Sequence, residues 1–315
     1  MSKKLTILDI ARLAGVGKST VSRVLTNHPK VKPETRAKVE QVIRDNDYVP
    51  SKSAQSMRGG SQKVIGVILS RLDSPSESRA VGSMLQTLYQ QGYDAVIMES
   101  QFDRQKTNEH LEVLHKRNVD GVIVFGFTEL DLELLAQWGS RAVVIAMDTE
   151  SVSSINYDNY GVIKKALAYL SAQKLQHIAY IGVDRSDKTT GSLRLDSYLD
   201  WCEKQGCQAN YRTGRLHHDS AYRLVDEVLA DDTQAIVCAS DTLALGVIKR
   251  LQELSRDDIV VTGVGGSEML SFLFPKVYSI DPGYVQAGHK AANLLISQLN
   301  GDESCVHLTQ SPLER

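Results

Sequence analysis

Residues 5–25, LTILDIARLAGVGKSTVSRVL, predict two short helices joined by a tight turn. Thr6 is placed to cap the first helix, and Asp9, three residues later, completes a capping box. The glycines of 15–17 then interrupt the helical pattern, because glycine adopts the backbone angles that a turn between crossed helices requires. A second helix is expected over 18–25, so the chain begins with a helix-turn-helix.

The second helix is expected to bury Val21, Val24 and Leu25 and to turn its polar side chains outward. In a helix-turn-helix, the start of the second helix meets base edges in the major groove of DNA. The residues predicted to contact DNA here are Thr6, Lys18, Ser19, Thr20, Ser22 and Arg23.

Charge supports this interpretation. Residues 1–60 hold 12 Lys+Arg and 5 Asp+Glu, a net +7, whereas the whole chain is −2 and the remainder therefore carries −9. A basic segment on an acidic body is the electrostatic pattern of a DNA-binding head. The stretch GVGKST resembles a phosphate-binding loop, but Arg12 stands where that motif needs glycine and no apolar strand precedes it. A nucleotide hydrolase is therefore excluded.

A third helix begins at Pro33, and Arg36 on it is predicted to touch the DNA phosphates. Residues 50–62, PSKSAQSMRGGSQ, predict a linker, because they combine Pro, Gly and Ser with little apolar surface. The expected division is a DNA-binding domain over 1–49, a hinge over 50–62 and a ligand-binding domain over 63–315.

From residue 63 onward, short apolar runs such as VIGVIL, GVIVF and AIVC alternate with amphipathic stretches of helical length. This alternation predicts parallel sheets that are buried on both faces. The runs are too numerous for one small sheet. The sequence therefore predicts an α/β body of two doubly wound parallel-sheet subdomains facing each other across a cleft, with chain crossings near 160 and 283.

Ligand sites in such folds lie at the carboxyl ends of the strands. The first strand is followed by a polar loop, RLDSPSE (71–77), that leads into a helix, and a helix start suits an anion. Several of the other strand-end positions also have structural explanations: Gly126 as a turn residue, Asp241 and Thr242 as helix caps, and Tyr284 as a core residue. The strand-end positions beyond the first loop are Gly126, Met147, Asp148, Asp187, Thr190, Arg194, Asp241, Thr242 and Tyr284.

The motifs TxxDIAxxAGVxxxTVSRVL, VKPETRAKVEQVI and DYVPSKSAQSMRG resemble the DNA-binding head and hinge of the lactose/galactose-repressor family. RLDSPSE, SDKTTG, ASDTLALG and DPGY are similar to its trehalose-responsive branch. The resemblance implies a homodimeric repressor with a periplasmic-binding-protein-like core, released from operator DNA by trehalose 6-phosphate. It further implies that Ala54 and Met57 contact DNA, Met57 as an apolar wedge in the minor groove.

The same resemblance places the effector among Arg71, Leu72, Asp73, Ser74, Pro75, Ser76, Glu77, Gly126, Asp187, Arg194, Thr242 and Tyr284. Two positions depart from the pattern. Met147 stands where the trehalose branch has arginine, and Gly265 stands where the broad family has aspartate. A different sugar, or a corepressor instead of an inducer, therefore stays open.

Other classes of function are disfavoured. The sequence contains no catalytic motif, so an enzyme is not expected, and its four cysteines have no metal-binding spacing. We expect no cofactor and no metal. A sugar-binding receptor is the alternative class, but the basic head and the absence of a leader argue against it. With no apolar stretch of about 20 residues, the protein is expected to be cytoplasmic. The tail has no heptad repeat, which favours a dimer.

Overall fold

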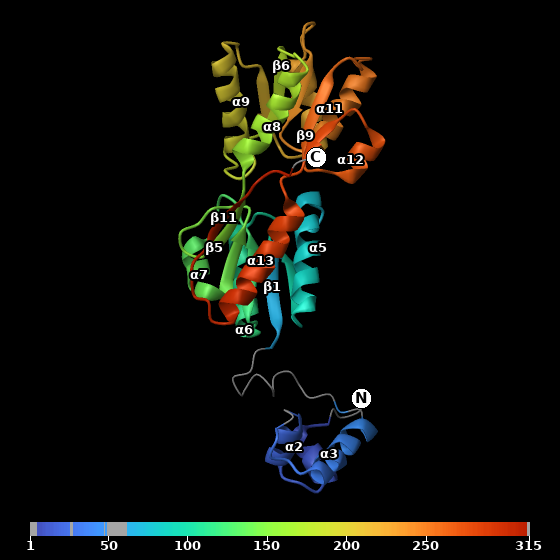
Figure 1. Ribbon diagram of the computed structural model, residues 1–315, viewed down its shortest axis with the longest axis vertical. Coiled ribbons are helices and arrows are strands. Elements are labelled where there is room, and N and C mark those ends of the chain that lie inside the picture. Colours follow the sequence, from blue (N-terminus) through green and yellow to red (C-terminus); the bar gives the residue numbers. More distant parts are fainter. Residues whose placement is uncertain (1–4, 26–27, 47, 49–61, 314–315) are drawn as a thin grey trace. The chain divides into compact units, whose positions relative to one another are not determined.

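The structure is a computed structural model that describes residues 5–25, 28–46, 48 and 62–313. The chain separates into two compact units, Met1–Gln62 and Lys63–Arg315 (Figure 1). The first unit, the head, contains the helices α1 (Ile7–Leu13), α2 (Lys18–Leu25) and α3 (Pro33–Asp45). One residue from each helix, Ile10, Val21 and Val39, is completely buried at their common centre. The hydrophobic contact among these three helices holds the head together.

The first lobe of the second unit is built on a six-stranded sheet in the order β11-β5-β4-β3-β1-β2. All of its strand pairs are parallel. Its strands are β1 (Val64–Leu69), β2 (Asp94–Glu99), β3 (Gly121–Phe125), β4 (Ala142–Ile145), β5 (Ser153–Tyr157) and β11 (His307–Gln310).

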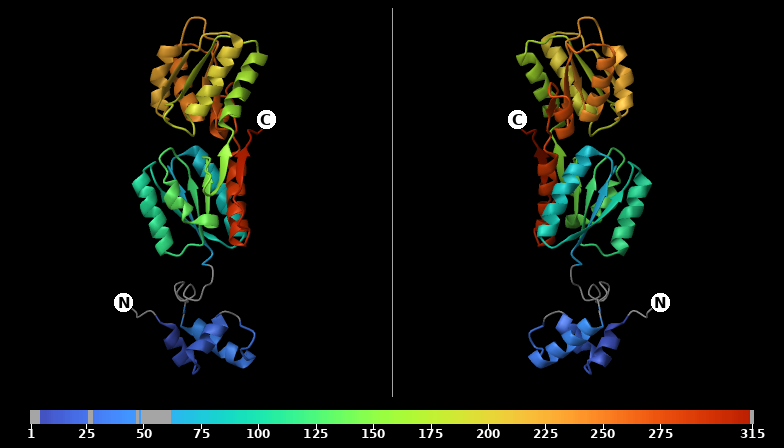
Figure 2. Two further views of the ribbon diagram at one scale, coloured as in Figure 1. Left: turned by 90° about the vertical axis from the view of Figure 1, so that its left-hand side faces the viewer. Right: turned by 90° about the vertical axis from the view of Figure 1, so that its right-hand side faces the viewer.

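Helices cover both faces of this sheet. Residues of α5 and α13 form one core with Ile65, Ile123 and Ile155, and residues of α6 and α7 form another with Ile68 and Val122. Figure 2 shows the helices lying on opposite sides of the strands. The elements are α5 (Pro75–Gln90), α6 (Arg104–Lys116), α7 (Leu132–Ala136), the 3-10 helix η1 (Gly139–Arg141) and α13 (Tyr284–Leu299).

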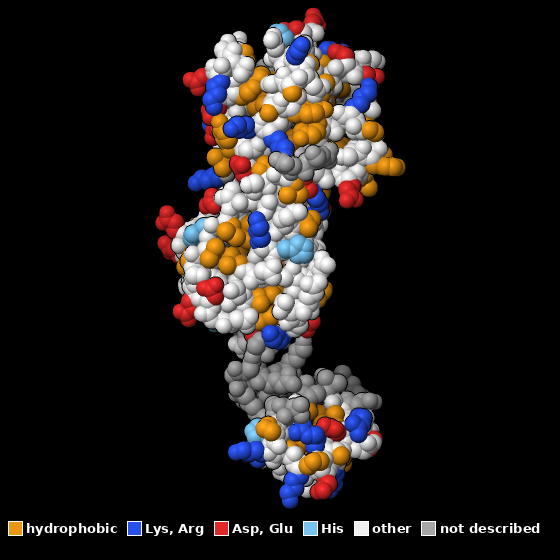
Figure 3. All heavy atoms as spheres, in the orientation of Figure 1, with side chains coloured by type: hydrophobic (Ala, Val, Ile, Leu, Met, Phe, Trp, Pro, Cys, Tyr) orange, Lys and Arg blue, Asp and Glu red, His pale blue; other side chains and the backbone are white. Residues whose placement is uncertain are grey.

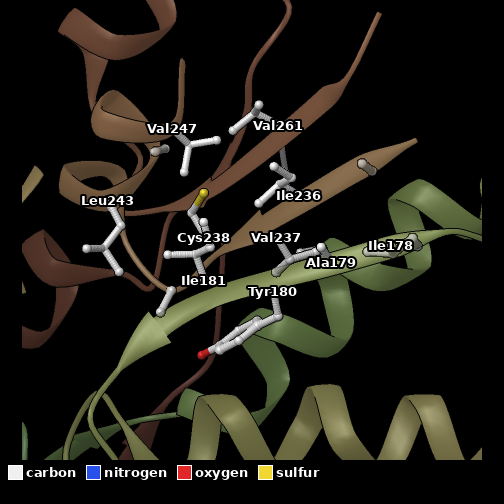
Figure 4. Packing of buried hydrophobic residues seen from close by; sticks show 14 of the residues in the cluster. Ile178, Ala179, Tyr180, Ile181, Ile236, Val237, Cys238, Leu243, Val247 and Val261 are labelled. Atoms are coloured by element: carbon white, nitrogen blue, oxygen red, sulfur yellow. The ribbon is translucent and has the colours of Figure 1, made fainter. Parts of the chain in front are cut away.

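The second lobe contains a five-stranded parallel sheet in the order β10-β9-β8-β6-β7. Its core packs strand residues such as Ile181, Ile236 and Cys238 against Val247 of α11 (Figure 4). Its strands are β6 (Ile178–Val183), β7 (Tyr211–Gly214), β8 (Ala235–Cys238), β9 (Val260–Val264) and β10 (Tyr278–Ile280). Its helices are α8 (Asn159–Ala172), α9 (Ser192–Gln205), α10 (His218–Val228), α11 (Asp241–Glu253) and α12 (Glu268–Leu273).

Three segments connect the lobes. The chain passes from β5 to α8 at Asp158 and from β10 to α13 through residues 281–283. The C-terminal segment returns beside the second crossing, where the amide of Leu313 donates to the carbonyl of Asp281 at 2.8 Å. Lys165 of α8 also donates to the Leu313 carbonyl at 2.6 Å. These connections bring the carboxyl ends of strands from both sheets to one cleft.

The predicted fold class, a helical head and two parallel-sheet subdomains, is confirmed. The sequence interpretation missed β5, β7, β10 and β11. SSINY, YRTG and HLTQ carry polar residues at positions that pair within a sheet, and β10 is only three residues long. No helix in the described parts of the chain is both long and apolar enough to cross a membrane.

Candidate functional site

The start of the head has the capping geometry that its sequence predicts. The side chain of Thr6 accepts a hydrogen bond from the Asp9 amide, and the Asp9 carboxylate accepts one from the Thr6 amide at 2.9 Å. Gly15 follows α1 with a φ of +63°, a left-handed conformation that favours glycine. This turn directs α2 across α1.

α2 presents a polar face to solvent. Lys18, Ser19 and Arg23 are exposed and Thr20 is half-buried. Ser22 is buried at 5% exposure, so its expected outward position was wrong. It follows Val21 directly and lies one turn before Leu25, so the helical repeat places its small side chain on the buried side.

Basic side chains gather on the surface of the head (Figure 3). Arg36 on α3 is half-buried, and its Nη2 donates to the His28 carbonyl at 2.9 Å, which orients the guanidinium. Ala54 and Met57, which are also predicted to contact DNA, lie outside the described residues.

A cavity lies between the two lobes, at the strand ends. Its inner chamber has a volume of about 80 Å³, and its outer part has a volume of about 1050 Å³. Arg71, Phe102 and Asp187 line both parts, which are therefore adjacent. The second lobe contributes Arg215, His217 and other polar side chains to the outer part.

Many of the predicted effector-binding residues meet at the inner chamber. Those that line it are Arg71, Ser74, Ser76, Glu77, Gly126, Asp187, Thr190, Arg194 and Tyr284. They come from the β1–α5 loop, the end of β3, the β6–α9 region and the start of α13. Segments far apart in the sequence thus converge on one site.

The structure places the other predicted effector-binding residues outside the lining of both parts of the cavity. They are Leu72, Asp73, Pro75, Met147 and Thr242. Leu72 is 62% exposed on the outer side of its loop. Met147 packs against the core between the sheet and the helices α6 and α7, which accounts for its apolar side chain.

Glu77 is the most perturbed acid of the chamber. Its Oε2 accepts hydrogen bonds from the amide of Ser70 at 2.7 Å and from the amide of Arg71 at 3.4 Å. Burial raises the pKa of Glu77 to about 7, although both amides and the Arg71 charge favour the ionised form. A carboxyl group close to neutrality beside a cavity can accept or donate a hydrogen bond to a ligand hydroxyl.

Asp187 organises its own turn. Its Oδ1 accepts hydrogen bonds from the amides of Thr189 and Thr190 at 2.8 and 2.9 Å. The carboxylate therefore shapes the β6–α9 loop and also lines the chamber. Thr189 and Thr190 of this turn also line the chamber.

Arg194 carries a buried positive charge on the wall of the chamber. It is 3% exposed, its Nε donates to Asn159 Oδ1 at 2.9 Å, and its Nη1 donates to the Ala239 carbonyl. Within the described residues, Arg194 forms no ion pair. Burying a cation among neutral acceptors is costly, and an unbalanced buried charge of this kind is more common at binding sites than elsewhere.

Aromatic side chains complete the chamber. Tyr157 and Tyr284 meet edge to face with ring centroids 5.0 Å apart, and burial raises the pKa of each phenol. Phe102 and Phe125 also line the chamber. Tyr157 and Asn159 were missed by the sequence interpretation because β5, which ends at Tyr157, was not recognised. Phe102 and Phe125 lie at or just after the ends of strands that were recognised, but they were not named as site residues.

Asp241 and Thr242 have structural positions at the start of α11. Ser240, not Asp241, caps the helix through the Leu243 amide. Asp241 is buried and accepts hydrogen bonds from the Ser279 hydroxyl at 2.6 Å and from the Ser267 amide at 2.8 Å. Asp241 therefore anchors the loop that follows β9.

Comparison with known proteins agrees with both units. Residues 6–51 match the model of bacterial regulatory proteins of the lacI family, and residues 167–314 match the periplasmic binding protein-like domain. The HTH-type transcriptional regulator TreR of Escherichia coli is 46% identical over 301 residues, which cover 96% of each chain. The regulator of the same name from Salmonella typhimurium is 45% identical over the same shares.

Solved structures give the same result. The trehalose repressor from Escherichia coli has a TM-score of 0.78 at 41% identity, covering 79% of this chain and 98% of that one. The Lac repressor bound to ONPG shares the fold, with a TM-score of 0.85 at 23% identity over 99% of this chain and 98% of that one.

These likenesses confirm the family resemblance and the expectation of a DNA-binding transcriptional regulator rather than an enzyme. The curated relatives span nearly the same length and are transcriptional regulators. The chain belongs to the lacI family of bacterial regulatory proteins.

Proposed function

We propose that this protein represses a sugar-utilisation operon and that trehalose 6-phosphate releases it from its operator. The observation that carries the proposal is an inter-lobe chamber lined by two guanidinium groups, those of Arg71 and of the buried Arg194, of which Arg194 forms no ion pair among the described residues. The likeness to the trehalose repressor supports the choice of sugar.

The chamber has the chemistry that a phosphorylated disaccharide requires. Sugars are bound by planar polar side chains that make paired hydrogen bonds to neighbouring hydroxyls, and by aromatic rings that cover their apolar faces. Arg194, Asp187 and Glu77 supply the first kind of contact, and the tyrosine pair supplies the second.

The phosphate is assigned to Arg71 at the start of α5. Arg71 lies where both parts of the cavity meet, and its Nε is 3.4 Å from Asp73 Oδ1. A planar guanidinium beside a helix start binds a dianion through paired hydrogen bonds. Met147, packed in the core, makes no contribution to this contact in the proposal.

DNA binding is assigned to the head, with residues 1–49 as its domain and 50–62 as the hinge. In the proposal, Thr6, Lys18, Ser19, Thr20 and Arg23 approach the duplex, and Ser22 supports the helix from within. Two copies bind the two halves of a pseudo-palindromic operator, through a dimer formed by residues 63–315.

To release the operator, the effector must bind more tightly to the lobe arrangement that does not bind DNA than to the arrangement that does. A 100-fold preference corresponds to about 2.7 kcal/mol of coupling free energy. The effector contacts both lobes, so it can change their arrangement through its differential affinity.

Calorimetric titration of the full chain with trehalose 6-phosphate, trehalose and glucose 6-phosphate tests the proposal. We expect trehalose 6-phosphate to bind at least tenfold more tightly than trehalose, because a tenfold difference in affinity corresponds to about the free energy of one charge-assisted hydrogen bond. Arg71→Gln should abolish this preference, whereas Arg117→Gln, which changes an exposed arginine of the same lobe, should not. Equal binding of trehalose would overturn the assignment of a sugar phosphate.

The sign of regulation is tested with a DNA duplex that the protein itself selects from a random-sequence pool. Trehalose 6-phosphate should weaken binding to this duplex in a fluorescence anisotropy titration. Stronger binding in its presence would identify a corepressor instead.

A further inference from the structure

Arg79 of α5 connects the two lobes. Its Nη2 donates to Asp281 Oδ2 at 2.8 Å, and its Nη1 donates to the carbonyls of Gly265 and Gly266. The Gly265–Gly266 loop follows β9 and belongs to the second lobe, and Asp281 lies in the crossing segment between the lobes. One guanidinium therefore joins a helix of the first lobe to the second lobe and to the crossing.

The acceptors on the second lobe are held in place. The Gly266 amide donates to Ser279 Oγ at 2.8 Å, and the buried Asp241 accepts from the Ser279 hydroxyl and from the Ser267 amide. Gly266 has a φ of +63°, and a Cβ at this position would come within 2.7 Å of the Asp281 side chain. The loop is thus shaped for close approach and fixed to the body of its own lobe.

The donor is tied to the effector chamber. Ser76 and Glu77 line the chamber on the first turn of α5, within one helical turn of Arg79. The Arg79 guanidinium also lies 5.8 Å from the centroid of the Tyr284 ring, another chamber residue. A ligand that moves the start of α5 relative to the second lobe must therefore alter the contacts of Arg79.

We propose that Arg79 is a positioning residue, which stabilises the arrangement of the lobes seen in this structure and thereby sets the effector concentration at which the operator is released. This inference rests on the proposed function, because it assumes an effector between the lobes. The ion pair is partly buried, with Arg79 and Asp281 side chains 33% and 17% exposed. A pair in this environment changes an equilibrium by roughly fivefold.

A second contact between the lobes provides an independent reporter. At the outer part of the cavity, the Lys188 amide of the second lobe donates to Thr128 Oγ1 of the first lobe at 3.2 Å. The Thr128 hydroxyl in turn donates to the Ser186 carbonyl at 3.3 Å. Exchange of the Lys188 amide with solvent deuterium therefore reports the lobe arrangement without any effector.

The chain offers a matched control for Arg79. Arg104 of α6 donates through Nε and Nη2 to Asp131 Oδ2 at 3.2 and 2.8 Å, and both residues belong to the first lobe. Arg104→Met thus removes a comparable ion pair that does not cross between lobes. Arg79→Met keeps most of the side-chain volume and removes the charge together with the hydrogen bonds to Gly265, Gly266 and Asp281.

The experiment compares the full-length protein with Arg79→Met and Arg104→Met. In Arg79→Met we expect the trehalose 6-phosphate concentration for half-release of the selected duplex to change roughly fivefold. We also expect its Lys188 amide to exchange faster in the effector-free protein, whereas Arg104→Met changes neither quantity. Asp281→Asn, which keeps an oxygen to accept from the Gly283 amide, should reproduce the effect of Arg79→Met.

The outcomes separate the two hypotheses. If the unaltered protein does not bind trehalose 6-phosphate but Lys188 exchange responds to Arg79→Met, the proposed effector is wrong and the role of Arg79 stands. If neither the half-release concentration nor the exchange rate responds, Arg79 has no positioning role. A loss of thermal stability alone, with both readouts unchanged, would also overturn the proposal, because a purely structural ion pair gives that result.

Discussion

Glu77→Gln tests whether the chamber disfavours the charge of its own carboxyl group. Burial raises the pKa of Glu77 from 4.5 to about 7 against the opposing effects of two backbone amides and Arg71. A glutamine keeps an oxygen to accept hydrogen bonds from the Ser70 and Arg71 amides. The substitution therefore removes the titration and preserves the geometry.

The sign and size of the effect follow from proton linkage. Because Glu77 has a higher pKa in the folded protein than in the unfolded chain, the folded protein binds more protons between pH 4.5 and about 7. The free energy of unfolding therefore falls as pH rises through this interval, by about 1.4 kcal/mol per pH unit for a fully developed shift. Relative to the unaltered protein, Glu77→Gln should gain about 2 kcal/mol between roughly pH 5.5 and roughly pH 8.5.

The assay is urea unfolding at several pH values, followed by tryptophan fluorescence. Trp138 lies in the first lobe, which contains Glu77, and Trp201 lies in the second, so the combined signal follows the unfolding of both lobes. Exposed Glu112→Gln on α6 is the matched control for the loss of a glutamate charge from the same lobe. A pH-independent difference for Glu77→Gln would refute the reasoning.

Three further predictions concern the head and the chamber. Arg23→Ala should weaken binding to the selected duplex by about 1–3 kcal/mol with unchanged effector affinity, whereas Arg12→Ala, on exposed α1 surface, should have a smaller effect in the same anisotropy titration. Normal DNA binding by Arg23→Ala would show that α2 is not the reading helix. Thr6→Ala should destabilise the head by about 1 kcal/mol, because the capping box is lost, and circular dichroism of the full chain during heating measures this change. An unshifted transition would argue against the cap. Gly126→Ala places a Cβ against the Cβ of Met147, so overpacking should lower stability by about 1–3 kcal/mol and weaken effector binding in calorimetry. Unchanged stability would mean that the end of β3 can relax.

The amino-acid sequence predicted the elements whose causes are local. The Thr6–Asp9 capping box and the Gly15 turn depend on residues a few positions apart, and the apolar runs of β1, β3 and β8 depend only on burial from both faces. These patterns also identified the strand ends, so several chamber residues could be named before their contacts were known. The exposed face of α2 followed from its helical repeat, except at Ser22 on the edge of the buried side.

The tertiary structure alone decided which strand-end residues share the cavity and which pairs join the lobes. Asn159 and Arg194 are 35 positions apart, and Arg79 and Asp281 are 202 positions apart. No local pattern encodes such pairs, because their geometry depends on how two sheets and the two chain crossings between them fix helices relative to one another. Met147 is a residue for which the strand-end pattern predicted a cavity position that the fold does not give. It follows a strand end, yet packing against the core keeps it out of the cavity lining. Helix caps, turns and strands arise from short-range forces that the sequence displays, whereas a cavity between lobes arises from long-range packing that only the folded chain displays.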